Sequence, residues 1–328
     1  MRNLYILLSL CMLVLGSASA QNIYYVDNSI DESGDFTSLQ DAIDVSQSGD
    51  YIYIYGSLYG YGDITINKQI NIIGPGIFLD ENYKDLLNKS MARVNDVNIV
   101  TGAENSYLAG LYFTGDLILQ QTSNIIIEKS KIYTKQHRIE ESHYIGYYRN
   151  YFSDNGSSNN TIFIHNFSSN ISFKKNIFKE LNLDSGQYVE FMHNIFLNQV
   201  KFNSATVMGN VFLGENPIDL DGLSNIKFNV LTDPTGLIPD NSYVRNQSSI
   251  CVGFPSQNYY STDSRFQLKD NSPAEGAGPN GTDCGIFGSP NPYVISGLAS
   301  VPFITELNAP FSAQVGDTIR VELKAMVR

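Results

Sequence analysis

The stretch Ile171-Ser172-Phe173-Lys174-Lys175-Asn176-Ile177-Phe178 decides the fold, because its pattern recurs on both sides of it. Two apolar residues alternate with polar ones, an asparagine follows three positions later, and a large apolar residue closes the unit. The asparagine position, which holds a serine in the first copy, is occupied by Ser130, Asn150, Asn176, Asn194, Asn210 and Asn229. The spacings are 20, 26, 18, 16 and 19 residues. A repeat of this length indicates a solenoid.

The apolar positions of the repeat have the period of a β-strand, and the asparagine breaks that period as a bend would. The position five residues before the asparagine holds Ile125, Ile145, Ile171, Val189, Ala205 and Ser224. The position three residues before it holds Ile127, Tyr147, Phe173, Phe191, Val207 and Ile226. One such unit cannot bury its apolar face alone, whereas stacked coils place each strand on its counterpart about 4.8 Å away. We therefore expect an all-β tube with an asparagine ladder along one bend.

The two ends of the repeat region differ from it. A short helix that covers the open end of the tube is expected from Leu39, Ala42 and Ile43, capped by Thr37 or Ser38. Strands are expected at 51–55, 64–66 and 70–73, and a loop at 80–95. From residue 292 the chain changes character: Pro302 and Pro310 indicate a linker, and 319–327 alternates like one half-buried strand. This tail is expected to lie along the tube or to begin a further module.

The first 20 residues have the features of a secretory signal peptide. A basic start is followed by the apolar run 4–15, and Ala18-Ser19-Ala20 resembles a cleavage site. We therefore divide the chain into a signal peptide (1–20), a β-helix domain (21–291) and a C-terminal tail strand (292–328). Arg2 is the only charge removed with the signal, so 20 basic and 33 acidic residues leave a mature net charge of −13. That charge argues against nucleic acid as a partner, and no later stretch predicts a membrane span.

Two cysteines, Cys251 and Cys284, remain after the signal. In an oxidising compartment an even pair is a candidate disulfide, and two buried free thiols are the alternative.

The sequence resembles the secreted bacterial right-handed parallel β-helix proteins of the pectate-lyase-like superfamily. The resemblance lies in the helix at 36–43, in the strands that follow, in the asparagine-bearing coils and in residues 272–288. It implies a right-handed, single-stranded β-helix over about residues 22–295. It does not imply one activity, because the superfamily holds lyases, hydrolases, esterases, adhesins and proteins of no known activity.

A column of outward-facing basic residues is the candidate site. Lys129, Arg149, Lys175 and His193 each precede a ladder position, so stacking places them about one coil apart. Tyr148 and Lys174 precede Arg149 and Lys175 and are candidate substrate-binding residues. Such a strip suits the carboxylates or sulfates of an acidic polysaccharide, and in a lyase it would supply a base and a carboxylate-stabilising cation. The alternative is a solvated row of charges near the bends.

Other signals for chemistry are weak. The segment 135–143 carries His137 and His143 at a spacing that does not suit a metal, and it is expected to be a surface loop. The tyrosines of 51–61 offer sugar-stacking rings, although strand propensity also accounts for Tyr51, Tyr53 and Tyr55. We expect no cofactor and no metal, since the signatures of polygalacturonase-like hydrolases, pectin methylesterases and the pectate-lyase calcium site are absent.

Three functions remain open from the sequence. The first is a non-catalytic secreted or cell-surface protein (extracellular or periplasmic) with a structural, adhesive or glycan-binding role, and a polysaccharide or cell-surface glycan as partner. The second is a polysaccharide lyase, or another carbohydrate-active enzyme, that acts on an acidic glycan at the outer face of the coils. The third is a trimeric phage-type spike, which the signal peptide argues against.

Overall fold

The computed structural model describes residues 21–328 apart from 31–32, 83–85, 87, 154–160, 166, 186–188, 215–217, 222–223, 233–237, 256–258, 289–290, 296, 299–302, 311, 313, 315, 317 and 327–328. The predicted signal peptide and Pro302 therefore lie outside the described residues.

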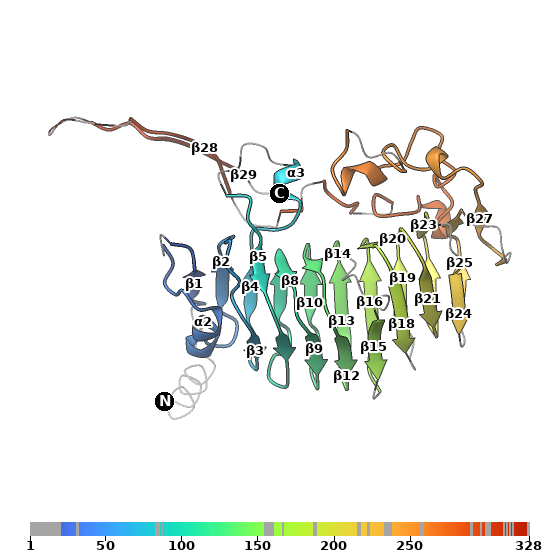
Figure 1. The fold of residues 1–328 in the computed structure, drawn as a ribbon, viewed down its shortest axis with the longest axis horizontal. Helices are drawn as coiled ribbons and strands as arrows, with labels where there is room; N and C mark the ends of the chain where they lie inside the picture. Colours follow the sequence, from blue (N-terminus) through green and yellow to red (C-terminus); the bar gives the residue numbers. More distant parts are fainter. Residues whose placement is uncertain are drawn as a thin grey trace, which may run out of the picture.

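The chain is an all-β parallel β-helix in which the described strands from β1 to β27 form three parallel sheets around one axis, as Figure 1 shows. Sheet A consists of β1 (Ile23–Val26), β2 (Tyr51–Ile54), β4 (Asn71–Ile73), β7 (Tyr107–Ala109), β10 (Ile126–Glu128), β13 (His143–Tyr148), β16 (Ser169–Lys174), β19 (Val189–Met192), β22 (Ala205–Met208) and β25 (Asn225–Lys227). Sheet B consists of β5 (Ala92–Val94), β8 (Leu111–Phe113), β11 (Lys131–Ile132), β14 (Tyr151–Phe152), β17 (Ile177–Phe178), β20 (Ile195–Phe196), β23 (Val211–Phe212), β26 (Val230–Leu231) and β27 (Ser242–Tyr243). Sheet C consists of β3 (Ile64–Ile66), β6 (Val97–Ile99), β9 (Leu117–Gln120), β12 (His137–Glu140), β15 (Thr161–His165), β18 (Leu181–Ser185), β21 (Val200–Asn203) and β24 (Ile218–Asp221).

The ladder lies at the bend between sheets A and B. The side-chain oxygen of each ladder asparagine accepts a hydrogen bond from the backbone N–H of the ladder residue one coil earlier, as in Asn150 to Asn176 (2.8 Å) and Asn194 to Asn210 (2.7 Å). The side-chain amide of Asn176 donates to the carbonyl of Tyr147 (2.9 Å). Every ladder residue from Ser130 to Asn229 is at most 1% exposed. The buried amides are thus satisfied by one another and by the bend, which removes the cost of burying them.

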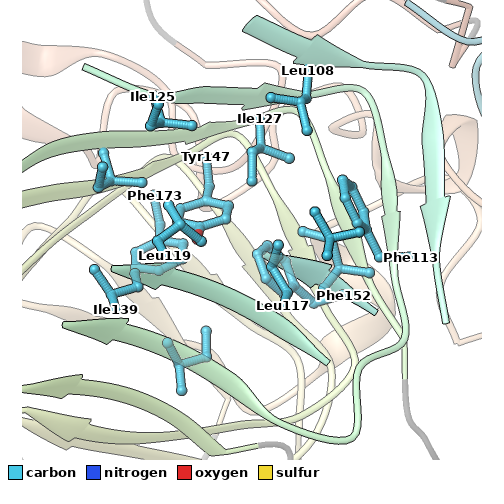
Figure 2. Packing of buried hydrophobic residues seen from close by; sticks show 14 of the residues in the cluster. Leu108, Phe113, Leu117, Leu119, Ile125, Ile127, Ile139, Tyr147, Phe152 and Phe173 are labelled. Carbon is cyan, nitrogen blue, oxygen red and sulfur yellow. The ribbon is translucent and has the colours of Figure 1, made fainter. Parts of the chain in front are cut away.

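The interior of the tube is filled by the apolar columns that the repeat predicts. Aromatic rings stack coil on coil, with centroids 4.7 Å apart for Phe173 and Phe191 and 4.3 Å apart for Phe152 and Phe178. Figure 2 shows buried side chains of this interior, among them Tyr147, Phe152 and Phe173, pointing into the space between the sheets. The in-register stacking reflects the short, constant distance between coils.

The N-terminal cap forms as expected, whereas the predicted loop at 80–95 is wrong. Helix α2 (Leu39–Val45) is capped by the Ser38 side chain, which accepts from the N–H of Asp41 (3.2 Å), and its apolar side faces the core. Residues 80–95 contain most of helix α3 (Leu79–Asn82) and all of strand β5. Strand β5 forms because Ala92 and Val94 face inward and complete the first coil of sheet B.

Two side chains that were expected at the surface lie inside the tube. His137 begins β12 and is 2% exposed, so the prediction of a surface loop at 135–143 is wrong. Its Nε2 lies 2.7 Å from the Tyr147 hydroxyl, and burial lowers the pKa of His137 to about 3. Tyr61 is also buried, and its hydroxyl donates to the Tyr55 carbonyl (2.8 Å).

Beyond β27 the chain turns back and covers part of sheet B, as the orange segment in Figure 1 shows. We call residues 244–298 the closing segment; it contains the 3₁₀ turns η1 (Gln247–Ser249), η2 (Ser264–Phe266) and η3 (Pro279–Gly281). A second apolar cluster joins Ile250, Phe266 and Ile286 of this segment to the outward Ile177 and Ile195 of sheet B.

The candidate disulfide between Cys251 and Cys284 is not formed. Both thiols are free and buried in the second apolar cluster, and burial raises the pKa of each to about 12. The Cys284 thiol lies 3.4 Å from the Phe228 carbonyl of the coils. The backbone of Cys251 forms an antiparallel β-bridge with Leu268 within the closing segment.

The C-terminal tail forms a hairpin of its own. Strand β29 (Glu322–Met326) pairs antiparallel with β28 (Phe303–Asn308), so the partner of the expected tail strand is a second strand of the tail and not a strand of the tube. β28 also occupies the stretch between the two prolines that was expected to be a linker. The hairpin extends away from the coils in Figure 1, and Val321 and Leu323 are exposed.

Candidate functional site

The four basic candidates occupy the bend position just before the ladder. Their backbones are left-handed, with φ of 48° at Lys129, 57° at Arg149, 58° at Lys175 and 54° at His193. This conformation costs a non-glycine residue about 1–2 kcal/mol. Gly110 and Gly209 fill the same position in the flanking coils without that cost. The bend therefore accepts glycine, and the basic side chains are not required by its geometry.

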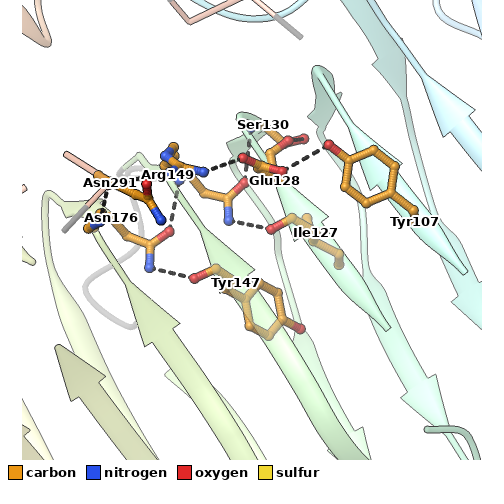
Figure 3. Close-up of polar contacts among 10 residues, drawn as sticks. Tyr107, Ile127, Glu128, Ser130, Tyr147, Arg149, Asn176 and Asn291 are labelled. Carbon is orange, nitrogen blue, oxygen red and sulfur yellow. Dashed lines mark hydrogen bonds and ion pairs between the residues drawn. The ribbon is translucent and has the colours of Figure 1, made fainter. Parts of the chain in front are cut away.

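Sheet register places these side chains in successive coils. Glu128, Tyr148, Lys174 and Met192 are paired one after another in sheet A, and the candidates follow them directly. The Arg149 guanidinium donates from Nη1 to Glu128 Oε1 (2.7 Å), and the Tyr107 hydroxyl donates to the other oxygen of the same carboxylate (2.8 Å). Figure 3 shows this chain of contacts beside the ladder. Lys174 pairs in the same way with Glu190 (2.8 Å).

Lys175 is the cation most affected by its surroundings. Its ammonium group donates to the carbonyl of Asn291, which Arg149 Nη2 also approaches (3.5 Å). Burial, Arg149 and Lys174 together lower the pKa of Lys175 to about 8. Burial also lowers the pKa of Lys129, although the neighbouring Glu128 opposes that shift. Positive charge is therefore concentrated around Lys175.

His193 is not the exposed base that its position suggested. It is 6% exposed, and its Nδ1–H donates a hydrogen bond to the carbonyl of Asp283 (3.1 Å). A Cβ on Gly209 would lie 2.8 Å from its ring, so glycine there makes room for the imidazole. Burial and Lys175 lower the pKa of His193. Its contact with Asp283 joins the closing segment to the coils.

A groove of about 440 Å³ opens between the coils and the closing segment. We call it the cationic groove; it is lined by Tyr148, Arg149, Lys174, Lys175, Met192, His193, Pro279, Asn280, Thr282 and Asn291. Lys129 is not among the residues that line it.

Tyr148 supplies the aromatic surface of the cationic groove. A Cβ built on Gly146 would lie 2.5 Å from the Cζ and hydroxyl of Tyr148 and 2.6 Å from its Cε2. The ring therefore lies flat across the sheet over the missing side chain of Gly146. A half-buried ring held flat in this way offers one face to a sugar.

The lining of the cationic groove determines which chemistry it can perform. Its described lining residues supply three cations and no carboxylate, so they favour an anionic ligand. Within the described part of the chain, no three His, Cys, Asp or Glu side chains lie close enough together to hold a metal ion. In the same residues, no helix is long and apolar enough to cross a membrane.

Sequence reasoning placed the column of candidates but missed what surrounds it. Glu128 is in register with Tyr148, one residue before its partner Arg149. Glu190 is in register with Ser172, two residues before its partner Lys174. The register of the repeat therefore brings each carboxylate near its partner, although neither pair was predicted from the sequence. Asn291, which contacts Arg149 from 142 residues away, and Thr282 come from the closing segment, and no local pattern predicts that they line the groove.

The chain was compared with protein-family models, with curated proteins and with solved structures, and none of the three gave a match.

Proposed function

We propose that this protein is a secreted, non-catalytic binding module for an acidic polysaccharide, and that the cationic groove is its glycan site. The observation that carries the proposal is a groove lined by Arg149, Lys174 and Lys175, with no carboxylate among its described lining residues, on a chain of net charge −12. In an acidic protein such a local reversal of sign attracts an anion to one place. The apolar segment at 4–15 supports secretion to the cell surface or beyond.

The aromatic and cationic parts of the groove suit different parts of one sugar. The flat ring of Tyr148 fits the apolar face of a pyranose, and the charges of Arg149 and Lys175 attract its carboxylate or sulfate. Glycine at 146 leaves room for the Tyr148 ring, and the left-handed bend at 149 and 175 directs both basic side chains outward at the groove.

Binding without chemistry is supported by the state of the candidate catalytic groups. Arg149 is paired with Glu128, Lys174 is paired with Glu190, and His193 is buried against the closing segment. These contacts hold the cations in place as a fixed surface.

One observation favours a polysaccharide lyase as the second candidate. With a pKa of about 8, part of the Lys175 population is neutral near pH 7.5 and can accept a proton. In such a reaction Lys175 would take the proton from the carbon that bears the uronate carboxylate, while Arg149 holds that carboxylate. The electron pair would form a C=C bond and expel the glycosidic oxygen, which takes a proton from water.

We also propose that the chain is a distant member of the pectate-lyase-like superfamily. The parallel coils, the ladder at one bend and the N-terminal capping helix support this relationship.

Binding assays on the chain from Gln21 test the function. Polygalacturonate and heparin are expected to bind, and neutral dextran is not. The double variant Arg149→Ala with Lys175→Ala is expected to bind both acidic polymers more weakly, whereas Lys201→Ala, which removes a cation on sheet C, is expected to bind them as the unmodified chain does. Unchanged binding by the double variant would exclude the cationic groove. Absorbance from unsaturated sugar products that disappears in Lys175→Ala would favour the lyase over the binding module.

A further inference from the structure

A second groove lies on the other side of the ladder bend. It has a volume of about 480 Å³, and its floor consists of the side chains that follow the ladder position in successive coils of sheet B. Arg93, Tyr112, Lys131 and Tyr151 are paired in that order by the sheet register. Ser130 therefore stands between Lys129, in the candidate column, and Lys131, on this floor. We call this cavity the sheet B groove.

The floor of the sheet B groove carries two cations around one aromatic ring. The ammonium nitrogen of Lys131 lies 4.6 Å from the centre of the Tyr112 ring, and the Arg93 guanidinium carbon lies 5.9 Å from it. Attraction to the ring holds both cations over the floor without neutralising them. Burial lowers the pKa of Lys131, and the carboxylates of Asp80 and Glu81 oppose that shift.

Helix α3 forms one wall of the sheet B groove and is fixed by the closing segment. Glu81 accepts hydrogen bonds from the backbone N–H of Thr262 and from its hydroxyl (3.0 Å). The Asn82 side chain donates to the fully buried Asp263 (3.1 Å). These contacts hold the wall in place, while Asp80 stays exposed at the groove.

The sequence leaves this part of sheet B uncovered. In later coils the same position holds Ile177, Ile195 and Val211, which are buried beneath the closing segment. In the earlier coils Arg93 is exposed and Lys131 is half-buried, so the apolar contact that seals the later coils is absent there. Covering charged side chains with an apolar segment is costly, so this part of sheet B remains accessible to a polar ligand.

We propose that the sheet B groove is a second site for an acidic saccharide, so that one chain binds two glycan segments. Arg93 and Lys131 would bind the carboxylate or sulfate, and Asp80 on the opposite wall would accept hydrogen bonds from sugar hydroxyls. Two such sites on one rigid tube give avidity for a long polymer and cross-link separate chains. This inference rests on the proposed function of the cationic groove.

Titration calorimetry with a short oligogalacturonate of one defined length, and with a heparin fragment of similar length, tests the inference. The unmodified chain is expected to bind two molecules of at least one of these two oligosaccharides. Arg93→Ala with Lys131→Ala is expected to bind one, and Arg149→Ala with Lys175→Ala also one. The variant Lys201→Ala is the matched control and is expected to bind two. Light scattering with long polygalacturonate should rise for the unmodified chain and stay low for either double variant.

The outcomes separate this inference from the proposed function. One bound ligand that is lost only in the Arg149 and Lys175 variant would overturn the second site and leave the proposed function intact. One bound ligand that is lost only in the Arg93 and Lys131 variant would support the sheet B groove and exclude the cationic groove. One ligand lost in both variants would mean that a single glycan spans the bend, which overturns two separate sites. Circular dichroism of each variant checks that the coils remain folded.

Discussion

Removing one amide from the middle of the ladder should weaken the whole tube by a predictable amount. In Asn194→Ala, the buried N–H of Asn176 loses its acceptor (2.8 Å) and the Phe173 carbonyl loses a donor (2.9 Å). A buried donor left without a partner costs about 1–3 kcal/mol, and each further lost hydrogen bond costs about 1 kcal/mol. The bond from the Asn176 side-chain amide (3.1 Å) and the bond to Asn210 (2.9 Å) are also lost, so we expect a decrease of about 4–6 kcal/mol in the free energy of unfolding.

Serine provides an intermediate case, because Ser130 already occupies the ladder and its hydroxyl accepts from the N–H of Leu111 (3.1 Å). Asn194→Ser keeps an acceptor near the orphaned N–H, so it should be milder than alanine by about 1–2 kcal/mol. The exposed Asn225→Ala is the control and should change stability by less than about 0.5 kcal/mol. Urea unfolding measures the three variants, and hydrogen exchange reports the amide of Asn176 directly. Equal, sub-kilocalorie effects of serine and alanine would refute a stabilising ladder.

Three further predictions concern the grooves and the closing segment. Gly146→Ala should displace the Tyr148 ring and weaken binding of polygalacturonate without changing the circular dichroism, while Thr206→Ala, in the same outward column of sheet A, should do neither. Since the pKa of Lys175 is about 8, its charge is present below that pH, so affinity for an acidic glycan should fall as the pH rises through 8. Lys175→Arg should remove this pH dependence. If the variant keeps the same pH profile as the unmodified chain, Lys175 is not the group that titrates. Cys251 and Cys284 should react with a thiol reagent only after denaturation of the chain from Gln21, because both are buried with a pKa of about 12; absence of reaction after denaturation without reductant would instead indicate a disulfide.

The coils could be predicted from sequence because every coil repeats the same constraint. An apolar residue must face inward at fixed distances from the ladder, and this requirement leaves columns that are visible in one chain. The ladder continues to Asn241, whose side chain accepts from the backbone N–H of Asn229 (3.0 Å). That step was missed because it follows Asn229 by only 12 residues, although Tyr243 completes the asparagine and apolar pair of the motif.

The surroundings of the site could not be predicted, because they depend on contacts without a repeat. The Arg149 contact with Asn291 spans 142 residues, and the contacts of α3 with Thr262 and Asp263 span 181. No periodicity links such positions, so composition alone misled the prediction for 80–95. The same limit applies to His193, because its contact with Asp283 of the closing segment spans 90 residues and has no repeat that would predict it.

The two residues that flank each ladder position account for both grooves. The residue before the asparagine is left-handed and points outward on the sheet A side, while the residue after it points outward on sheet B. The pair Lys129 and Lys131 therefore directs charge to both sides of Ser130, whereas Lys175 and Ile177 direct charge to one side and an apolar group to the other. An apolar residue after the asparagine packs against the closing segment. The coils that carry such a residue are therefore the coils in which the closing segment covers sheet B. Replacing Ile177 with lysine would thus be expected to extend the sheet B groove by one coil and to loosen the segment that forms the cationic groove, so the two sites are coupled through one bend.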